Sequence, residues 1–191
     1  MRRAIVVAAV LVLAACAGES AANYRGSSPP PGMALPSFEL QSYTGERIAS
    51  PKLEGKVVLL TFLESKCTEA CPIIASQVAH GLELLKPEER REVAALAIST
   101  QPEDDTPANV RAFLRARHAE GKLDYLIGSE ADLRPGWTKA SILSAIDSGD
   151  ADVHSAPVRI YDREGEWVST LHAGADLTPD ALAHDVRVAL G

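Results

Sequence analysis

Cysteine is scarce in this chain of 191 residues, which holds three: Cys16, Cys67 and Cys71. Because Cys16 lies in an N-terminal segment with the character of an export signal, two cysteines remain for the rest of the chain, four positions apart. A disulfide that closes so short a loop removes little conformational entropy from the unfolded chain. We therefore expect the pair to serve chemistry, and a purely structural disulfide is the less favoured alternative.

The sequence also lacks an excess of positive charge. Its 26 Asp and Glu outnumber 19 Lys and Arg, which gives a formal net charge of −7 at pH 7. With no basic run along the chain, neither nucleic acid nor an anionic membrane surface is the expected ligand. We also find no internal repeat.

The first residues are typical of a bacterial export signal. Arg2 and Arg3 precede an uncharged apolar run at residues 4–15, which is shorter than the roughly 20 residues that a membrane-spanning helix needs. Cys16 follows two alanines, as in the lipobox of lipoproteins. We expect residues 1–15 to be a lipoprotein signal peptide and Cys16 to be lipid-modified; an ordinary cleaved signal peptide is the alternative.

The rest of the chain divides into a spacer and one domain. Residues 16–33 are rich in Ser, Pro and Gly and are expected to be a lipidated tether. Residues 34–191 are long enough for a single domain with its own core. Together these segments predict a lipoprotein anchored to a membrane of the bacterial cell envelope, with its domain facing the periplasm.

Apolar patterning within that domain alternates between strand and helix periods. The expected strands cover residues 38–41, 46–49, 56–63, 92–99, 123–127, 158–162 and 167–172, and the expected helices cover residues 73–85, 107–118 and a final segment from Thr178. This order predicts an α/β three-layer sandwich with a central mixed sheet and an N-terminal β-hairpin. The arrangement resembles the thioredoxin fold.

The cysteine pair directly follows the buried strand at residues 56–63, at the edge of the sheet where active sites gather in α/β folds. Pro72 lacks an amide hydrogen and fits the first turn of a helix, so both sulfurs are expected near a helix N-terminus. The positive end of the helix dipole favours thiolate, the form that binds metals and attacks disulfides.

Spacing of four residues brings two side chains to within about 5–6 Å on a helix, which allows a shared metal ion or a disulfide. Two thiolates are soft ligands that select Cu(I) or Zn(II). A third ligand is needed, and we expect it to be His154, just before the strand at residues 158–162. The remaining histidines are expected to be surface or hydrogen-bonded residues: His80, His118, His172 and His184.

Three motifs in this order resemble the SCO/SenC family of copper-delivery proteins, which help to assemble cytochrome c oxidase. They are Cys67-x-x-x-Cys71-Pro72 after an apolar strand, Asp105-Thr106-Pro107 opening a helix, and Val153-His154-Ser155 followed by a strand and Asp162-x-x-Gly165. The resemblance covers nearly all of residues 35–191.

What the resemblance implies is a copper ion bound by Cys67, Cys71 and His154. It also implies a partner, either a cytochrome c oxidase subunit or another copper chaperone. Because the periplasm is oxidising, we further expect a periplasmic thiol reductant as a partner. Family members usually carry an aspartate where this chain has Ser99-Thr100-Gln101-Pro102, and often an acidic residue where it has Val153. These departures remove carboxylates from the expected surroundings of the copper ion.

Two functions stay open at this point. The first is a copper chaperone, which is not an enzyme in the ordinary sense. The second is a thiol–disulfide oxidoreductase that keeps a partner's cysteines reduced, with Cys67 attacking and Cys71 resolving the mixed disulfide. Pro157 then either matches the cis-proline that thioredoxins place beside their cysteines or marks the start of a strand.

Overall fold

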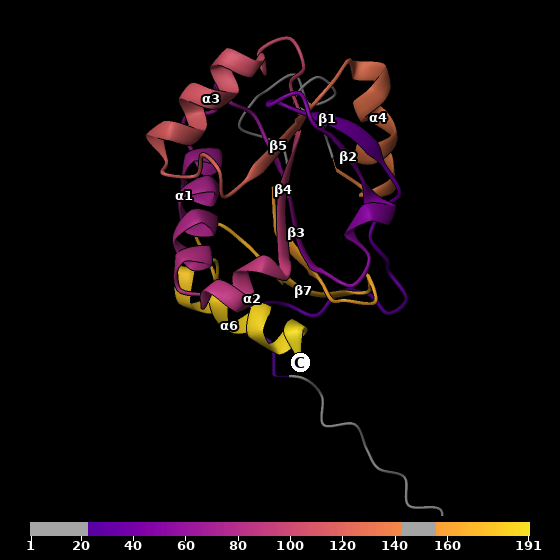
Figure 1. Cartoon of the computed structure of the whole chain (residues 1–191), viewed down its shortest axis with the longest axis vertical. Coiled ribbons are helices and arrows are strands. Elements are labelled where there is room, and N and C mark those ends of the chain that lie inside the picture. The colour runs from indigo at the N-terminus through magenta and orange to yellow at the C-terminus, as the bar shows by residue number, and fades with distance from the viewer. Residues whose placement is uncertain (1–22, 143–155) are drawn as a thin grey trace, which may run out of the picture.

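We describe residues 23–142 and 156–191 of a computed structural model of the chain (Figure 1). The predicted signal peptide, Cys16 and His154 lie outside these residues. A mixed seven-stranded sheet has the order β2-β1-β5-β4-β3-β6-β7. Its strands are β1 (Glu39–Ser42), β2 (Arg47–Ala49), β3 (Val57–Leu63), β4 (Val93–Ser99), β5 (Asp124–Ile127), β6 (Val158–Tyr161) and β7 (Trp167–Leu171). The helices are the 3₁₀-helix η1 (Ser50–Leu53) and α1 (Ala70–Glu83), α2 (Pro87–Arg91), α3 (Pro107–Ala116), α4 (Glu130–Lys139) and α6 (Pro179–Leu190).

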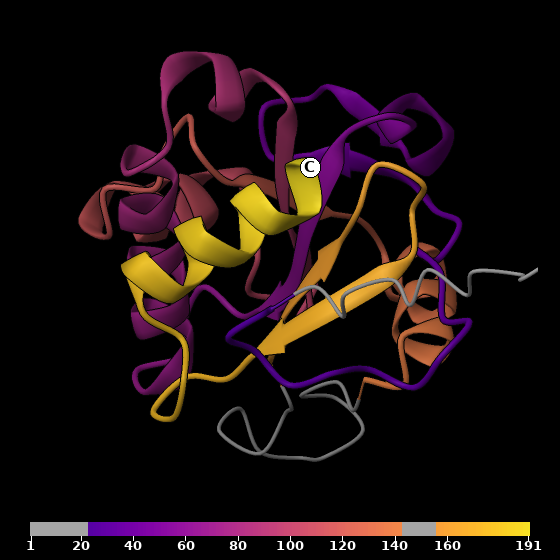
Figure 2. The same cartoon turned by 90° about the horizontal axis from the view of Figure 1, so that it is seen from below.

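The central strand β3 explains the layering. All seven of its residues are buried, because apolar side chains alternate between the two faces of the sheet. On one face Val57, Leu59 and Leu63 pack in a core with α1, α3 and α6. On the other face, Val58 and Phe62 belong to a second core with α4. Figure 2 shows α1 and α6 on one side of the sheet and α4 on the other, which confirms the predicted three-layer α/β sandwich.

The predicted N-terminal hairpin is also confirmed. β1 and β2 pair antiparallel with Leu40 opposite Ile48. Gly45 in the connecting turn has a φ of +96°, a conformation that costs glycine little because it has no Cβ.

Two helix signals were misread from the sequence. The sequence analysis assigned no helix to residues 130–139, where Pro135 lies inside a helix and removes one of its hydrogen bonds. Helix α4 forms there because Ser129 and Asp132 cap each other's backbone amides, at 3.1 and 3.3 Å. The helix expected at residues 73–85 is shorter at its end, because α1 ends at Glu83, and Pro87 opens the separate short helix α2.

Pro157 directly precedes β6. None of the described peptide bonds is cis, the bond that joins Ala156 to Pro157 included. Pro157 is therefore a proline at the start of a strand.

A strap of backbone before β1 covers the outer edge of β7. Ser27 and Ala34 form isolated bridges with Thr170 and Glu166. The segment that was expected to be a tether thus already contacts the domain at Ser27. Covering an edge strand in this way prevents pairing with other chains.

One buried carboxylate holds the beginning of this strap. Asp185 in α6 is fully buried and accepts hydrogen bonds from the amides of Arg25 and Gly26, at 2.7 and 3.0 Å. It also accepts one from Ser169 Oγ at 2.6 Å. The approach requires glycine, because a Cβ on Gly26 would lie 2.3 Å from Ser169 Oγ. Within the described residues, no helix is both long and apolar enough to cross a membrane.

We expect Asp185→Ala to lower the free energy of unfolding by about 3 kcal/mol, because the buried hydroxyl of Ser169 and the partly buried amides of Arg25 and Gly26 lose their acceptor. Urea denaturation measures this effect. The matched control is Asp180→Ala, an exposed position on the same helix, which should cost no more than about 0.5 kcal/mol. Equal effects of the two variants would show that the hydrogen bonds of Asp185 do not hold the strap in place.

Candidate metal and thiol site

The two cysteines meet where β3 gives way to α1. Cys67 lies in the connecting loop and Cys71 is the second residue of the helix. Both are thiols and both are buried, with 5% and 0% of their surfaces exposed. The amide of Cys71 donates a hydrogen bond to Cys67 Sγ at 3.4 Å. The sulfur of Cys67 therefore sits at the positive end of α1, where the thiolate is favoured.

The surroundings of Cys71 raise its proton affinity. A hydrogen bond with Cys67, followed by burial, raises the pKa of Cys71 far above its usual range. The carboxylate of Glu64, itself 3% exposed, adds a smaller electrostatic contribution in the same direction. Cys71 thus keeps its proton, while the sulfur of Cys67 is the acceptor at the helix end.

A buried carboxylate fixes the loop that carries Cys67. Asp105 is 2% exposed and accepts a hydrogen bond from the amide of Ser65 at 2.8 Å. It also accepts from Ser99 Oγ at 2.6 Å and from the hydroxyl of Tyr125 at 2.8 Å. One side chain therefore ties the cysteine loop to the ends of β4 and β5.

The sequence analysis named Asp105 only as part of a motif that opens a helix. The cap of α3 is in fact Thr106, whose hydroxyl accepts from the amide of Asn109 at 3.2 Å. Nothing in the local sequence marks Asp105 as a hub, because its partner Tyr125 is 20 positions away and reaches it only through the pairing of β4 with β5.

The segment Ser99–Pro102, which lacks the family's aspartate, makes hydrogen bonds that hold two strands together. Thr100 is fully buried, and its amide and hydroxyl donate to the carbonyl of Leu63 at 2.9 and 3.1 Å. These bonds clamp the carboxyl ends of β3 and β4 together directly before the cysteine loop. The hydroxyl of Thr100 thus stabilises the sheet next to the cysteine loop.

The described residues supply two of the three expected ligands. Among residues 23–142 and 156–191, no cluster of three or more His, Cys, Asp or Glu side chains is arranged to hold a metal ion. Four histidines fall as expected: His80, His118 and His172 are exposed, and His184 contacts the carbonyl of Asn23 at 2.9 Å. None of these four joins the cysteines in such a cluster.

A family model for SCO1/SenC matches residues 28–191. The chain belongs to the SCO1/SenC family. This confirms the resemblance seen in the sequence motifs, and the match begins within the strap that precedes β1.

Individual relatives agree with this assignment. A SCO2-like protein of Rickettsia conorii is 26% identical over 156 residues, which cover 78% of this chain and 74% of that protein. The structure of Bradyrhizobium japonicum ScoI with copper bound is 26% identical, covers 81% of this chain and 98% of its own, and has a TM-score of 0.64. The structure of BsSco, described as a Sco-family cytochrome c oxidase assembly protein with a disulfide switch, has a TM-score of 0.71 at 20% identity and covers 86% and 97% of the two chains. That last likeness concerns the fold.

We expect alkylation of the reduced protein to label Cys67 before Cys71, by at least about tenfold in rate. The reason is that Cys71 is fully buried with a raised pKa, whereas the sulfur of Cys67 lies at a helix N-terminus. Timed treatment with iodoacetamide and peptide mass mapping measure the two rates. Faster labelling of Cys71 would contradict the assignment.

Stability should depend on pH through Asp105. Burial raises its pKa above the ordinary 3.8 despite the hydrogen bonds from Ser65, Ser99 and Tyr125. The folded state therefore binds this proton more tightly than the unfolded chain, so stability falls as pH rises from 3.8 to the raised pKa.

In urea titrations at several pH values, the advantage of the native protein over Asp105→Asn should shrink across that window. Asp132→Asn is the control of opposite sign. Hydrogen bonds from Ser129 lower the pKa of Asp132, so that carboxylate stabilises the fold above 3.8 and loses its effect as pH falls. If the stability of the native protein relative to Asp105→Asn instead grows with pH, burial does not raise the pKa of Asp105 and the prediction is wrong.

Proposed function

We propose that this protein is a copper chaperone that binds one copper ion through Cys67, Cys71 and His154. The observation that carries the proposal is the position of both sulfurs at the N-terminus of α1: Cys71 lies in the first turn of the helix, and Cys67 lies in the preceding loop, which Asp105 holds through Ser65. Thiolates at this spacing are soft ligands suited to Cu(I). The related ScoI of Bradyrhizobium japonicum was solved with copper bound.

Strand register supports the proposal of His154 as the third ligand. β6 runs antiparallel to β3 with Arg159 opposite Leu60, so the chain before β6 approaches the carboxyl end of β3. Ala156 packs against the same core that contains Cys67 and Cys71. Two residues of chain span at most about 7 Å, and this short connection to Ala156 supports His154 as the ligand. We therefore assign the imidazole of His154 as the third ligand.

Copper is the cargo of such a protein, and its delivery requires a membrane-bound client. We propose that Cys16 carries a lipid that anchors the domain to the cell envelope on the periplasmic side, with residues 1–15 removed as a signal peptide. The client would be a cytochrome c oxidase subunit or another copper chaperone, as family membership suggests. A periplasmic thiol reductant would keep Cys67 and Cys71 able to bind the ion.

A second candidate function, thiol–disulfide exchange, rests on the different surroundings of the two sulfurs. Cys67 accepts the helix amide while Cys71 holds its proton, which is the division of roles that thiol–disulfide exchange needs. In this function Cys67 attacks a disulfide of the partner and Cys71 then displaces the partner's reduced cysteine, leaving a Cys67–Cys71 disulfide. The two electrons pass to the partner, so a reductant must restore the pair.

Anaerobic Cu(I) titration of the reduced protein against a competing chelator tests the copper site. We expect one ion per chain, with binding lost in Cys67→Ser and Cys71→Ser and weakened about 10–100-fold in His154→Ala, since two sulfurs alone make an incomplete site. His184→Ala is the matched control, because that imidazole contacts Asn23 instead of the pair.

Native affinity in His154→Ala would remove His154 from the site. Failure of the native protein to bind Cu(I) while it reduces a model disulfide would replace the copper function by thiol–disulfide exchange.

A further inference from the structure

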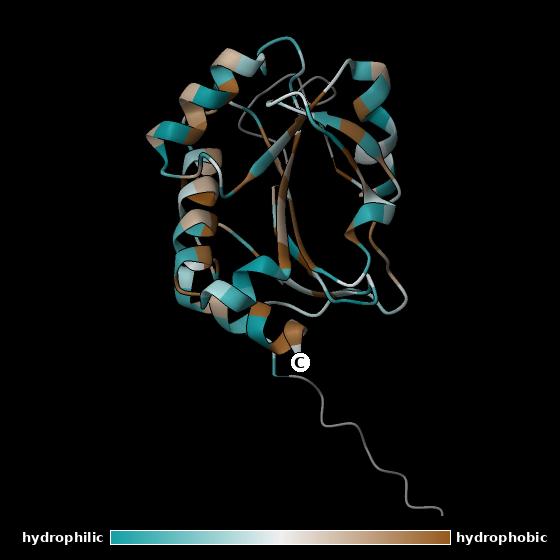
Figure 3. Ribbon diagram, viewed as in Figure 1, coloured by the Kyte–Doolittle hydropathy of each residue, from teal (hydrophilic) through white to brown (hydrophobic). Residues whose placement is uncertain are grey.

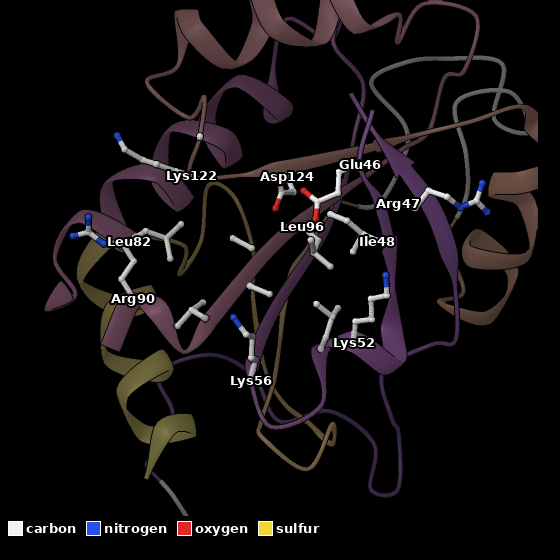
Figure 4. Close-up of a pocket in the computed structure, with 15 residues that line it drawn as sticks. Glu46, Arg47, Ile48, Lys52, Lys56, Leu82, Arg90, Leu96, Lys122 and Asp124 are labelled. Atoms are coloured by element: carbon white, nitrogen blue, oxygen red, sulfur yellow. The ribbon is translucent and has the colours of Figure 1, made fainter. Parts of the chain in front are cut away.

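An open groove of about 440 Å³ lies at the amino-terminal end of β4 (Figure 4). β4 runs parallel to β3, and Cys67 follows the carboxyl end of β3, so this groove and the cysteines lie at opposite ends of the sheet. The length of β4 separates them by roughly 20 Å at about 3.3 Å per residue. The groove is therefore independent of the copper site proposed above.

The groove exists because the sheet is incompletely paired. β5 pairs with β4 from Leu96 onward, where Leu96 lies opposite Asp124. The three preceding residues, Val93–Ala95, pair with β3 on one side, and no strand from the described ranges pairs with them on the other. An open strand edge of this kind offers backbone donors and acceptors to another extended chain. Its length is about 10 Å.

The walls combine an apolar floor with charged rims. The apolar side chains come from β2, η1, α1 and β4: Ile48, Leu53, Leu82, Val93 and Leu96. Five cations line the groove, Arg47, Lys52, Lys56, Arg90 and Lys122, together with two carboxylates, Glu46 and Asp124. A surplus of cations here stands out in a chain whose formal net charge is −7.

Two of the five cations are already paired with carboxylates. Arg47 forms an ion pair with Glu39 at 3.0 Å, and Lys122 forms one with Glu83. These two groups contribute little further attraction for a ligand.

Three cations are left for a ligand. Lys56 Nζ donates to a backbone carbonyl at 3.2 Å, and Arg90 donates to carbonyls at 3.0 and 3.2 Å. Lys52 makes no polar contact with any residue that the structure describes. Across the described chain no carboxylate lies within ion-pair distance of these three cations, whose charge is therefore available to an anion.

The carboxylates of the groove mark its polarity. Glu46 and Asp124 lie side by side in Figure 4, on the side of the groove away from Lys56. Burial and the charge of Glu46 raise the pKa of Asp124. A ligand with carboxylates along its whole length would be repelled at this end, so its acidic groups belong at the end with the three cations.

We propose that the groove binds an extended acidic segment of a partner protein, which adds to β4 beside Val93–Ala95 and directs its carboxylates to Lys52, Lys56 and Arg90. Main-chain hydrogen bonds supply the general affinity of such β-augmentation, and side-chain charges supply its specificity. The apolar floor accepts the alternate side chains that point into the groove.

Fluorescence anisotropy of a fluorescein-labelled heptapeptide tests this proposal; in this peptide valine alternates with serine in one half and with glutamate in the other, so that its carboxylates lie at one end. We expect saturable binding that weakens with salt and falls about tenfold or more in a Lys52→Glu, Lys56→Glu double variant. Lys139→Glu is the matched control, because this lysine lies on α4 outside the groove and should leave binding unchanged.

Two further probes test the mode of binding. The same peptide with proline in place of each valine keeps the glutamates but loses the amide hydrogens along one edge, so it should bind far more weakly. With the alternating peptide, amide hydrogen exchange at Val93 should slow, which a contact by charge alone would not produce. Cys67→Ser should bind the peptide normally, which separates this site from copper binding.

Several outcomes would overturn the proposal. They are absence of saturable binding, equal binding of the proline peptide, equal loss of binding in Lys139→Glu, and sedimentation showing that these cations mediate pairing of two copies of the chain. Binding of anionic phospholipid vesicles through the same lysines, with no effect of the peptide, would also overturn it.

Discussion

The carboxylate of Asp105 is the constraint on which the cysteine site depends. It is buried where three separate segments converge, and its hydrogen bonds to Ser65, Ser99 and Tyr125 hold them together. A buried carboxylate without partners would cost several kcal/mol, so these donors and the acid need one another. Asp105 therefore positions the loop that carries Cys67 through its hydrogen bond with Ser65.

The hydropathy of the elements shows how the rest of the scaffold supports this arrangement (Figure 3). The central strands are apolar, whereas helices such as α3 alternate between apolar and polar residues and bury one side. Helix α1 leads directly from its N-terminus at the sulfurs into the core through Ile74 and Val78. The orientation of that N-terminus is thus fixed by packing along the length of the helix, and the sulfurs inherit this rigidity.

Much of the fold could be predicted from the sequence because its signals are local. The largely apolar sequence of β3 and the apolar face of α1 are enough to locate both elements, and the turn between β1 and β2 contains Gly45. Helix α4 could not be predicted by the same means, since Pro135 hides it and the capping pair that specifies it occupies only two positions.

The site divides in the same way. Cys67 and Cys71 are recognisable from spacing and from Pro72, which places them at a helix end. Asp105 is not recognisable as a hub, because sheet pairing alone brings it to Tyr125. The groove beside Val93 depends on the residue at which β5 begins, which is the feature that sequence patterns locate least well. His154 remains a prediction from the sequence.

The Cu(I) affinity of Asp105→Asn tests most directly whether the buried hub builds the metal site. The variant keeps the size of the side chain but loses the charge that accepts from three donors. With the protein shown to be folded by circular dichroism, we predict that Cu(I) binding is weakened about tenfold, because the loop no longer holds Cys67 against α1. An unchanged affinity in a folded variant would contradict the account and show that the cysteine pair organises its own geometry.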